Sequence, residues 1–215
     1  SAILQSVDAG GTATVERYIT GWTDDAHGWH LLSSPVAAQA ISPAFTEPSV
    51  LNYDFYQWDE VTNTWLNEKI PGNNITTFTP GTGYLVAYAS TGTKQFNGEL
   101  NTADVTASNL TISTGDNYGW NLLGNPFPSA IRWNDGMDWI VPATFAQSAK
   151  VWNEPTAAYV DIAPSGIIPA MNGFMVHVES GSPASLTIPV AARKHDPQAW
   201  YKDSGEKLVL VAYDR

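Results

Sequence analysis

The chain has 215 residues, enough to bury a hydrophobic core without disulfide bonds. It contains no cysteine, which excludes thiol nucleophiles, cysteine zinc sites, iron–sulfur clusters and disulfide frameworks. Ten basic residues against 21 acidic ones give a formal net charge of −11, so the surface repels phosphate backbones and anionic lipid and no nucleic-acid partner is expected. No run of about 18 apolar residues predicts a membrane span.

Short alternating or apolar segments follow one another along the chain, between turns rich in Gly, Pro, Asn and Asp. Such a pattern predicts many strands at short spacing, in a sandwich or a barrel. We predict an all-β fold with very little helix, a jelly-roll-like β-sandwich. The expected strands are residues 13–19, 29–32, 54–58, 84–88, 109–113, 120–123, 150–152, 174–178, 185–188 and 207–212.

The chain contains an internal repeat with a period of about 90 residues. Residues 28–35 (GWHLLSSP) recur as 119–126 (GWNLLGNP), and residues 80–86 (PGTGYLV) recur as 169–176 (PAMNGFMV). Between these matches, Trp58, Glu60 and Trp65 correspond to Trp152, Glu154 and Tyr159. Three ordered matches at nearly constant offset indicate a true duplication.

The two copies span residues 12–104 and 105–193, and no Pro/Gly/Ser-rich linker separates them. We therefore expect one composite domain over residues 1–193, although two small domains are also compatible with the repeat. Residues 194–215 lie outside the repeat, and their apolar strand is expected to lead toward a following domain.

The repeat sorts the tryptophans into two classes. Trp29, Trp58, Trp120 and Trp152 recur in both copies, which favours core packing. The tryptophans without a counterpart are better candidates for function, because the duplicated scaffold does not require them. They are Trp22, Trp133, Trp139 and Trp200.

Residues 125–139 are the densest candidate region. Pro128, with Ser129 or Asn125 as a cap, predicts one helical turn that would place Trp133 beside an acidic loop. In that loop, residues 134–138 (NDGMD) carry oxygen donors around a glycine, as short calcium loops do, but lack the spacing and terminal Glu of an EF-hand. No cofactor is expected, and calcium is a weak alternative.

Enzymatic motifs are missing from the sequence. It has no HExxH, GxSxG or phosphate-binding glycine motif, so we expect no enzyme activity. A hydrolase based on two carboxylates is the remaining catalytic alternative. Its candidate residues are Asp54, Asp59, Glu60, Glu154 and Asp161.

The repeated motifs at 28–35, 80–86 and 119–131 resemble a β-rich region of large secreted surface proteins of the Bacteroidetes phylum, typically those with a type IX secretion sorting domain. Residues 192–202 resemble the segment that leads into the next strands there. The resemblance covers most of residues 12–215 and implies a secreted or cell-surface location. It carries little information about chemistry, since turn and core residues make up these motifs.

The sequence is compatible with three functions. The first is a non-catalytic binding module for a polysaccharide or surface glycan, because sugar rings stack on flat aromatic side chains while Asn and Asp bind hydroxyls. Its candidate ligand-binding residues are Trp133, Trp139, Asn134, Asp138, Tyr53, Tyr56 and Trp65. The second is a structural spacer or adhesin stalk that contacts only neighbouring domains of the same polypeptide. The third is the carboxylate hydrolase.

Overall fold

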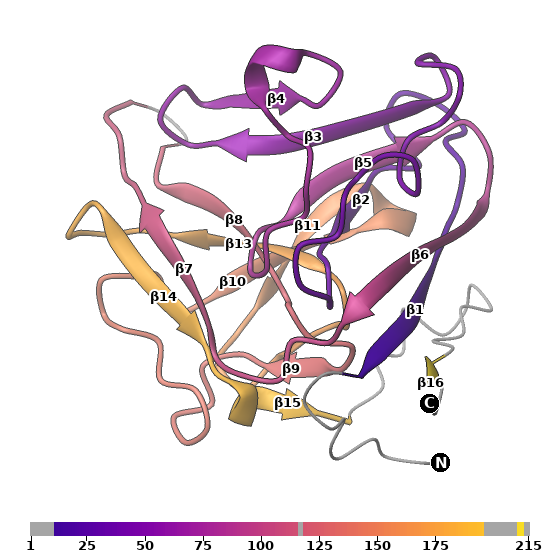
Figure 1. Cartoon of the computed structure of the whole chain (residues 1–215). Helices are drawn as coiled ribbons and strands as arrows, with labels where there is room; N and C mark the ends of the chain where they lie inside the picture. Colours follow the sequence, from indigo (N-terminus) through magenta and orange to yellow (C-terminus); the bar gives the residue numbers. More distant parts are fainter. Residues whose placement is uncertain (1–10, 116–117, 196–209, 213–215) are drawn as a thin grey trace.

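The computed structural model describes residues 11–115 and 118–195, and the backbone of residues 210–212 (Figure 1). The first strand alternates between inward and outward residues. In β1 the side chains of Ala13, Val15, Arg17 and Ile19 are buried, while those between them are at least partly exposed, as expected for a strand with one face on the core. The first-half strands are β1 (Thr12–Ile19), β2 (His30–Leu32), β3 (Tyr53–Asp59), β4 (Thr64–Asn67), β5 (Tyr84–Tyr88) and β6 (Gly92–Glu99).

The second half contains more and shorter strands, and helical structure in the described residues is limited to 3-10 turns. The remaining strands are β7 (Val105–Leu110), β8 (Trp120–Gly124), β9 (Ala130–Arg132), β10 (Ala149–Asn153), β11 (Ala158–Ile162), β12 (Ile167–Ile168), β13 (Gly173–His177), β14 (Ala184–Ile188), β15 (Arg193–Lys194) and β16 (Leu210–Ala212). The 3-10 turns are η1 (Pro71–Asn73), η2 (Glu154–Thr156) and η3 (Val190–Ala192).

The two halves have the same topology. The first half forms a sheet in the order β2-β5-β3-β4, and the second forms one in the order β8-β13-β10-β11, in which each strand corresponds to its counterpart in the repeat. The antiparallel pair β1–β6, formed by the first and last strands of the first repeat, corresponds in the same way to β7–β14 in the second. All of the pairings are antiparallel, and the fold is an all-β sandwich-like arrangement, as predicted.

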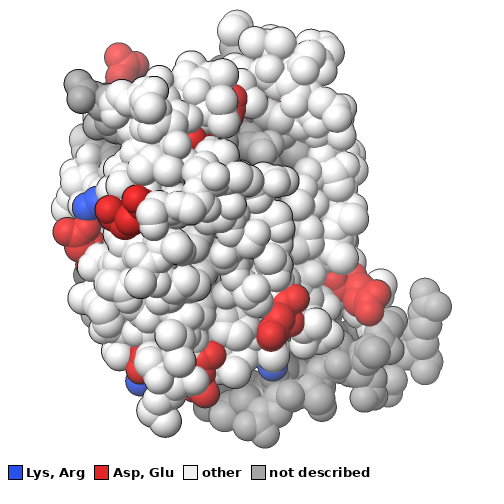
Figure 2. Space-filling model, turned by 90° about the vertical axis from the view of Figure 1, so that its left-hand side faces the viewer, with Lys and Arg blue, Asp and Glu red and all other residues white. Residues whose placement is uncertain are grey.

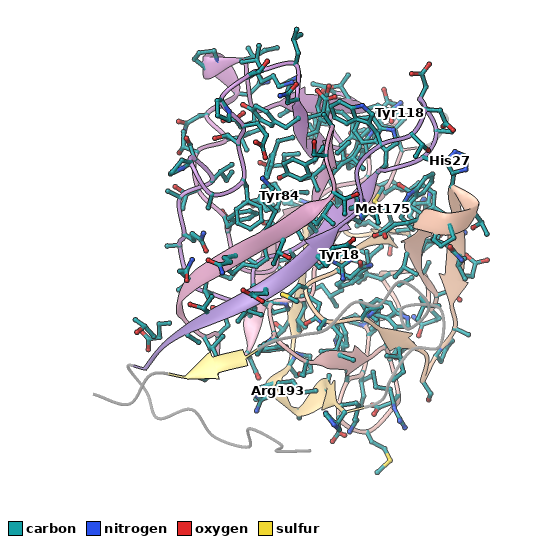
Figure 3. All side chains as sticks on the ribbon, turned by 90° about the vertical axis from the view of Figure 1, so that its right-hand side faces the viewer. Tyr18, His27, Tyr84, Tyr118, Met175 and Arg193 are labelled. Carbon is teal, nitrogen blue, oxygen red and sulfur yellow. The ribbon has the colours of Figure 1, made fainter. Side chains whose placement is uncertain are left out.

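Three apolar clusters hold the sandwich together. One fills the first half around Phe55, Phe78 and Phe96, and another fills the second half around Trp133 and Phe174. A third, smaller cluster of Leu31, Leu122 and Met175 lies between the two four-stranded sheets and receives side chains from both. In Figure 3, Tyr84 and Met175 lie at a similar height in the view, and Arg193 lies well below both, near the lower end of the molecule. The two repeats therefore share buried surface.

Small residues let the two sheets approach closely. Isolated bridges join Leu32 to Asn172 and Thr82 to Leu123, so the same contact is made twice, once by each repeat. A Cβ atom on Gly83 would lie 2.4 Å from the main-chain oxygen of Leu123, and one on Gly124 would lie 2.1 Å from Ser33 Oγ. Glycine is required at both positions by this close packing.

Several expected elements differ in the structure. The strand expected at 109–113 is β7, which ends at Leu110, and the helical turn expected at Pro128 is replaced by a bend that leads into β9. Within the strand expected at 207–212, residues 210–212 pair with β1, and residues 207–209 lie outside the described residues. In the part of the chain that the structure describes, no helix has the length and apolarity needed to cross a membrane.

Candidate functional site

The two tryptophans expected to bind a ligand are core residues. Trp133 has no exposed surface, and Trp139 is 3% exposed. Their rings pack edge to face with centroids 4.9 Å apart, and Trp133 also packs on Phe174. Trp133 Nε1 donates to the main-chain oxygen of Gln147. Neither ring offers a free face on which a sugar could stack, so these residues fill the second core instead.

The loop at residues 134–138 is stabilised by its own hydrogen bonds. Asp135 Oδ1 accepts bonds from the backbone N–H groups of Met137, Asp138 and Trp139. Burial acts to raise the pKa of Asp135, but these three hydrogen bonds and the charge of Lys194 outweigh it and lower the pKa.

The other polar groups of this loop are also engaged. Asn134 donates to Gln147, and Asp138 forms an ion pair with Lys194 at 2.5 Å. Among the described residues, no group of three or more His, Asp or Glu side chains could hold a metal ion. The oxygen pattern that suggested calcium is accounted for by a turn that orders the loop.

Tyr53, another predicted ligand-binding residue, is buried. Its hydroxyl donates to Glu68 Oε2 at 3.0 Å, and Lys69 Nζ lies 4.6 Å from its ring centroid. Burial, with the neighbouring Glu68 carboxylate, raises the pKa of Tyr53 to about 12. Tyr53 lies two residues before Phe55 on β3, so both side chains point to the same face of the sheet, into the first core.

Tyr56 and Trp65 do lie together, on the sheet face opposite that core. Tyr56 pairs with Asn67, and Trp58 pairs with Trp65, across β3 and β4. The Trp58 and Trp65 rings are half-buried, with centroids 5.1 Å apart. The hairpin thus presents two adjacent indoles with a tyrosine and an amide beside them.

The second repeat builds the corresponding arrangement on β10 and β11. Trp152 pairs with Tyr159, and their ring centroids are also 5.1 Å apart. Lys150 and Asp161, the counterparts of Tyr56 and Asn67, form an ion pair. Tyr159 is 43% exposed, which makes it the most accessible ring of the two pairs.

These two aromatic pairs, with Trp120, form what we call the aromatic seam: Trp58, Trp65, Trp120, Trp152 and Tyr159. Trp58 Nε1 donates to the main-chain oxygen of Trp120 at 2.6 Å, so the first hairpin is attached to the second half. Lys150 Nζ lies 5.5 Å from the Trp120 ring centroid. The repeat predicts core positions for Trp58, Trp120 and Trp152. In the structure all three are only partly buried, and they pack against the small cluster between the two sheets.

Of the five candidate catalytic carboxylates, three are held by local contacts. Asp54 pairs with Lys69, Asp161 with Lys150, and Asp59 accepts bonds from the Val61 N–H and the Thr62 hydroxyl. The remaining two, Glu60 and Glu154, connect the repeats. Each of the five therefore has a structural partner of its own.

Glu60 extends from the first repeat into the second. Its carboxylate is 4% exposed and accepts hydrogen bonds from the Thr111 hydroxyl, the Ser113 N–H and hydroxyl, and the Gly119 N–H. Burial acts to raise the pKa of Glu60, but these hydrogen bonds outweigh it and hold the pKa below its ordinary value. We call this contact the Glu60 clasp.

Glu154 makes the reciprocal contact, from the second repeat into the first. Its Oε1 atom lies 2.7 Å from Nδ1 of buried His30 and 3.3 Å from Nη2 of Arg17. We call this contact the Glu154 clasp. The two equivalent glutamates thus hold the repeats together from opposite sides, one through neutral donors and the other through Arg17 and the His30 ring.

The lysines that the structure describes are all engaged by acidic groups. All four lysines in the described part of the chain form ion pairs with carboxylates. Figure 2 shows a face with largely uncharged side chains, among which a few acidic groups are scattered and basic groups are fewer. A neutral ligand suits this surface better than a polyanion.

Comparison with known proteins gives a family. Residues 3–165 match a family described as Domain of unknown function (DUF8693), which covers the first repeat and much of the second. No curated protein matches the chain significantly, and neither does any solved structure. The chain belongs to this family of domains of unknown function.

Proposed function

We propose that this protein is a non-catalytic binding module that recognises a neutral polysaccharide or surface glycan through the aromatic seam. The observation that carries the proposal is the repeated pair of half-exposed rings, Trp58 with Trp65 and Trp152 with Tyr159. The rings of each pair meet at an angle, 59° for Trp58 with Trp65 and 74° for Trp152 with Tyr159, and their partly exposed faces offer apolar surface on which sugar C–H groups can stack.

Polar groups beside each pair supply the directional bonds that a sugar requires. Asn67 lies two residues from Trp65 along β4, on the same face of the sheet, and Asp161 lies in the same relation to Tyr159 on β11. Amide and carboxylate oxygens accept bonds from hydroxyl groups, while the Asn67 amide also donates. The ion pairing of every lysine in the described residues supports a neutral ligand. A location outside the cell belongs to the same proposal and is supported by the sequence resemblance alone.

The experiment is NMR of the indole N–H groups during titration with a panel of plant, algal and bacterial oligosaccharides. We expect saturable shifts of the Trp65 and Trp152 indole signals with one ligand class. Trp133 should remain unmoved, because its N–H is bonded to Gln147 inside the core. Trp65→Ala and Tyr159→Ala should each weaken binding about tenfold or more. Such a loss is comparable with the roughly 1–3 kcal/mol per ring that nucleic-acid bases gain by stacking on aromatic side chains.

Met137→Ala is the matched control. Its side chain is 87% exposed and lies in the loop at 134–138 that sequence reasoning placed in the site. The proposal requires this variant to bind like the unmodified protein. Weaker binding by Met137→Ala together with unchanged binding by Trp65→Ala would move the site to that loop and contradict the proposal.

A second candidate function is a rigid spacer between other domains. The observation in its favour is that Trp133 and Trp139, the aromatics the repeat does not require, are buried and that two clasps join the halves. In that case every indole signal would remain in place across the oligosaccharide panel, while the spectrum retained the dispersion of a folded protein.

A further inference from the structure

The Glu154 clasp contains an arrangement that its counterpart lacks. His30 has no exposed surface, and each of its ring nitrogens lies close to an oxygen atom, Nδ1 in an ion-pair contact that lacks hydrogen-bond alignment. Nδ1 lies 2.7 Å from Glu154 Oε1, and Nε2 lies 2.9 Å from the main-chain oxygen of Thr20, with the Thr20 hydroxyl at 3.2 Å. In the second repeat the position of His30 is taken by Asn121, which bonds to Thr111 instead.

This geometry determines how many protons the His30–Glu154 contact must hold. A carbonyl oxygen can only accept, so Nε2 must carry a hydrogen to face Thr20. Nδ1 would then oppose a carboxylate with a bare lone pair unless a second proton is present, on Nδ1 or on Glu154. The folded state therefore requires one proton more than a neutral histidine beside an ionised glutamate.

The surroundings keep this proton on the histidine side. In the described part of the chain, the charged groups at the contact are Arg17 from β1 and Glu154 from η2, and β5 contributes the apolar Val86 opposite His30. Burial acts to raise the pKa of Glu154, but the contact with His30 and the charges of His30 and Arg17 outweigh it and lower the pKa. An imidazolium facing a carboxylate is the arrangement that fits.

We propose that His30 and Glu154 hold one buried proton between them, and that this proton fixes the β10–β11 hairpin against the first half, so that the position of the Trp152–Tyr159 pair depends on pH. Glu154 begins η2, which joins β10 to β11, so this contact holds the tip of the hairpin that carries the pair, while β10 also pairs with β13 in the sheet. The Glu60 clasp has only neutral donors and holds the first hairpin at any pH above the carboxyl range. The consequence for ligand binding rests on the proposed function, but the proton itself does not.

The direction of the effect is set by the charges. When the shared proton is lost as the pH rises, a lone pair faces the carboxylate and the clasp weakens. As the pH falls below the ordinary carboxyl range, near pH 4.3, Glu154 is protonated and the ion pair is lost as well. The clasp is therefore strongest between these limits.

The direct test is side-chain ¹⁵N NMR of the histidines from about pH 5 to about pH 9, where an ordinary histidine titrates midway. We expect both nitrogens of His30 to be protonated at neutral pH, and His30→Asn identifies the signal while giving the first repeat the residue that the second repeat already uses. A neutral His30 with one bare nitrogen at pH 6 would overturn the proposal.

The second readout is stability. One lost proton changes the unfolding equilibrium constant by about tenfold per pH unit, so the wild type should lose stability with rising pH more steeply than His30→Asn by that factor. Glu60→Gln should retain the wild-type alkaline slope. The wild type, His30→Asn and Glu60→Gln are all compared with the additional substitution His177→Gln. This removes His177, which makes similar contacts with Glu179 and Tyr118. Equal slopes for wild type and His30→Asn would contradict the proposal.

The third readout separates the clasp from the proposed function. Hydrogen exchange, corrected for intrinsic rates, should show that amides of β10 and β11 lose protection above neutral pH while those of β3 and β4 do not. If protection changes in this way and no glycan binds, the clasp stands and the proposed function fails. Unchanged protection of β10 and β11 would overturn the coupling to the hairpin.

Discussion

Single atoms decide how closely the two repeats pack. Gly124 lies where the sheets meet, and an added Cβ would clash with Ser33 Oγ at 2.1 Å and with the main-chain oxygen of Thr82 at 2.5 Å. Neither neighbour is free to move, because Ser33 is fully buried and Thr82 forms a bridge to Leu123. The junction therefore tolerates no side chain at this position.

Gly124→Ala should accordingly destabilise the protein by about 3 kcal/mol, the upper part of the range for overpacking a core. Gly72→Ala is the control, because a Cβ there meets nothing within 4 Å, and its effect should remain below about 1 kcal/mol. Urea unfolding measures both. A loss for Gly124→Ala as small as that for Gly72→Ala would mean that the sheets are not in close contact.

The Glu60 carboxylate makes a specific prediction about acid stability. Its pKa is lowered in the folded protein, so the stabilisation it confers is present above the ordinary glutamate pKa of about 4.3 and is lost as the pH falls through the lower folded value. Glu60→Gln places an amide NH₂ group against donors that include the N–H groups of Ser113 and Gly119. It should cost about 1–3 kcal/mol at neutral pH and reduce the acid dependence.

Thermal unfolding from neutral pH down to about pH 3 checks this expectation, since the range brackets the ordinary carboxyl pKa. The difference between the two proteins should be largest at neutral pH and shrink as the medium becomes acidic. A difference that stays constant across this range would show that Glu60 is not ionised in the folded state.

At the scale of elements, the hairpins show what the sequence could predict. Residues 84–88 were expected as a strand and form β5 with the same bounds, because apolar side chains follow a turn rich in glycine. β4 and β11 were not expected, because the sequences of Thr64–Asn67 and Ala158–Ile162 give no clear apolar face. In the structure most residues of β4 are partly exposed, and most residues of β11 are exposed. Their existence follows from pairing with β3 and β10, a contact that no local pattern encodes.

The candidate site was predictable only in part, for the same reason. Tyr56 and Trp65 were named from the sequence and share a face, but their neighbours Trp58, Trp152 and Tyr159 were not named as ligand-binding residues. The repeat identified these positions as common to both copies, which is also true of core residues. Half-burial arises from the partial overlap of two sheets, and this overlap is a property of the tertiary structure alone.

The attachment of the first hairpin gives a prediction at this scale. Trp58→Phe retains an aromatic ring but removes the N–H that donates to the main-chain oxygen of Trp120. The loss of one partly buried hydrogen bond should destabilise the protein by about 1 kcal/mol. Trp65→Phe is the matched control, since no hydrogen bond from its indole is seen in the described residues. Urea unfolding should show a clearly larger loss for Trp58→Phe.

At the scale of the molecule, the repeats are expected to unfold together. The cluster of Leu31, Leu122 and Met175 is built from both halves, and the two clasps cross between them. Residue-resolved NMR in urea should therefore give the same midpoint for amides of β5 and of β13. Two separate midpoints would show that each half is an independent folding unit and that the clasps contribute little.

For the whole molecule, the proposed glycan binding depends on the aromatic seam. Under the proposed function the two equivalent pairs engage a single extended glycan, so losing both should cost more binding affinity than losing either. The measurement that tests this most directly is the calorimetric affinity of the wild type, the Trp65→Ala/Tyr159→Ala double variant and Met137→Ala for the glycan found in the NMR panel. The account predicts that the double variant loses binding at least a hundredfold while remaining folded and that Met137→Ala binds normally. A folded double variant with wild-type affinity would contradict it.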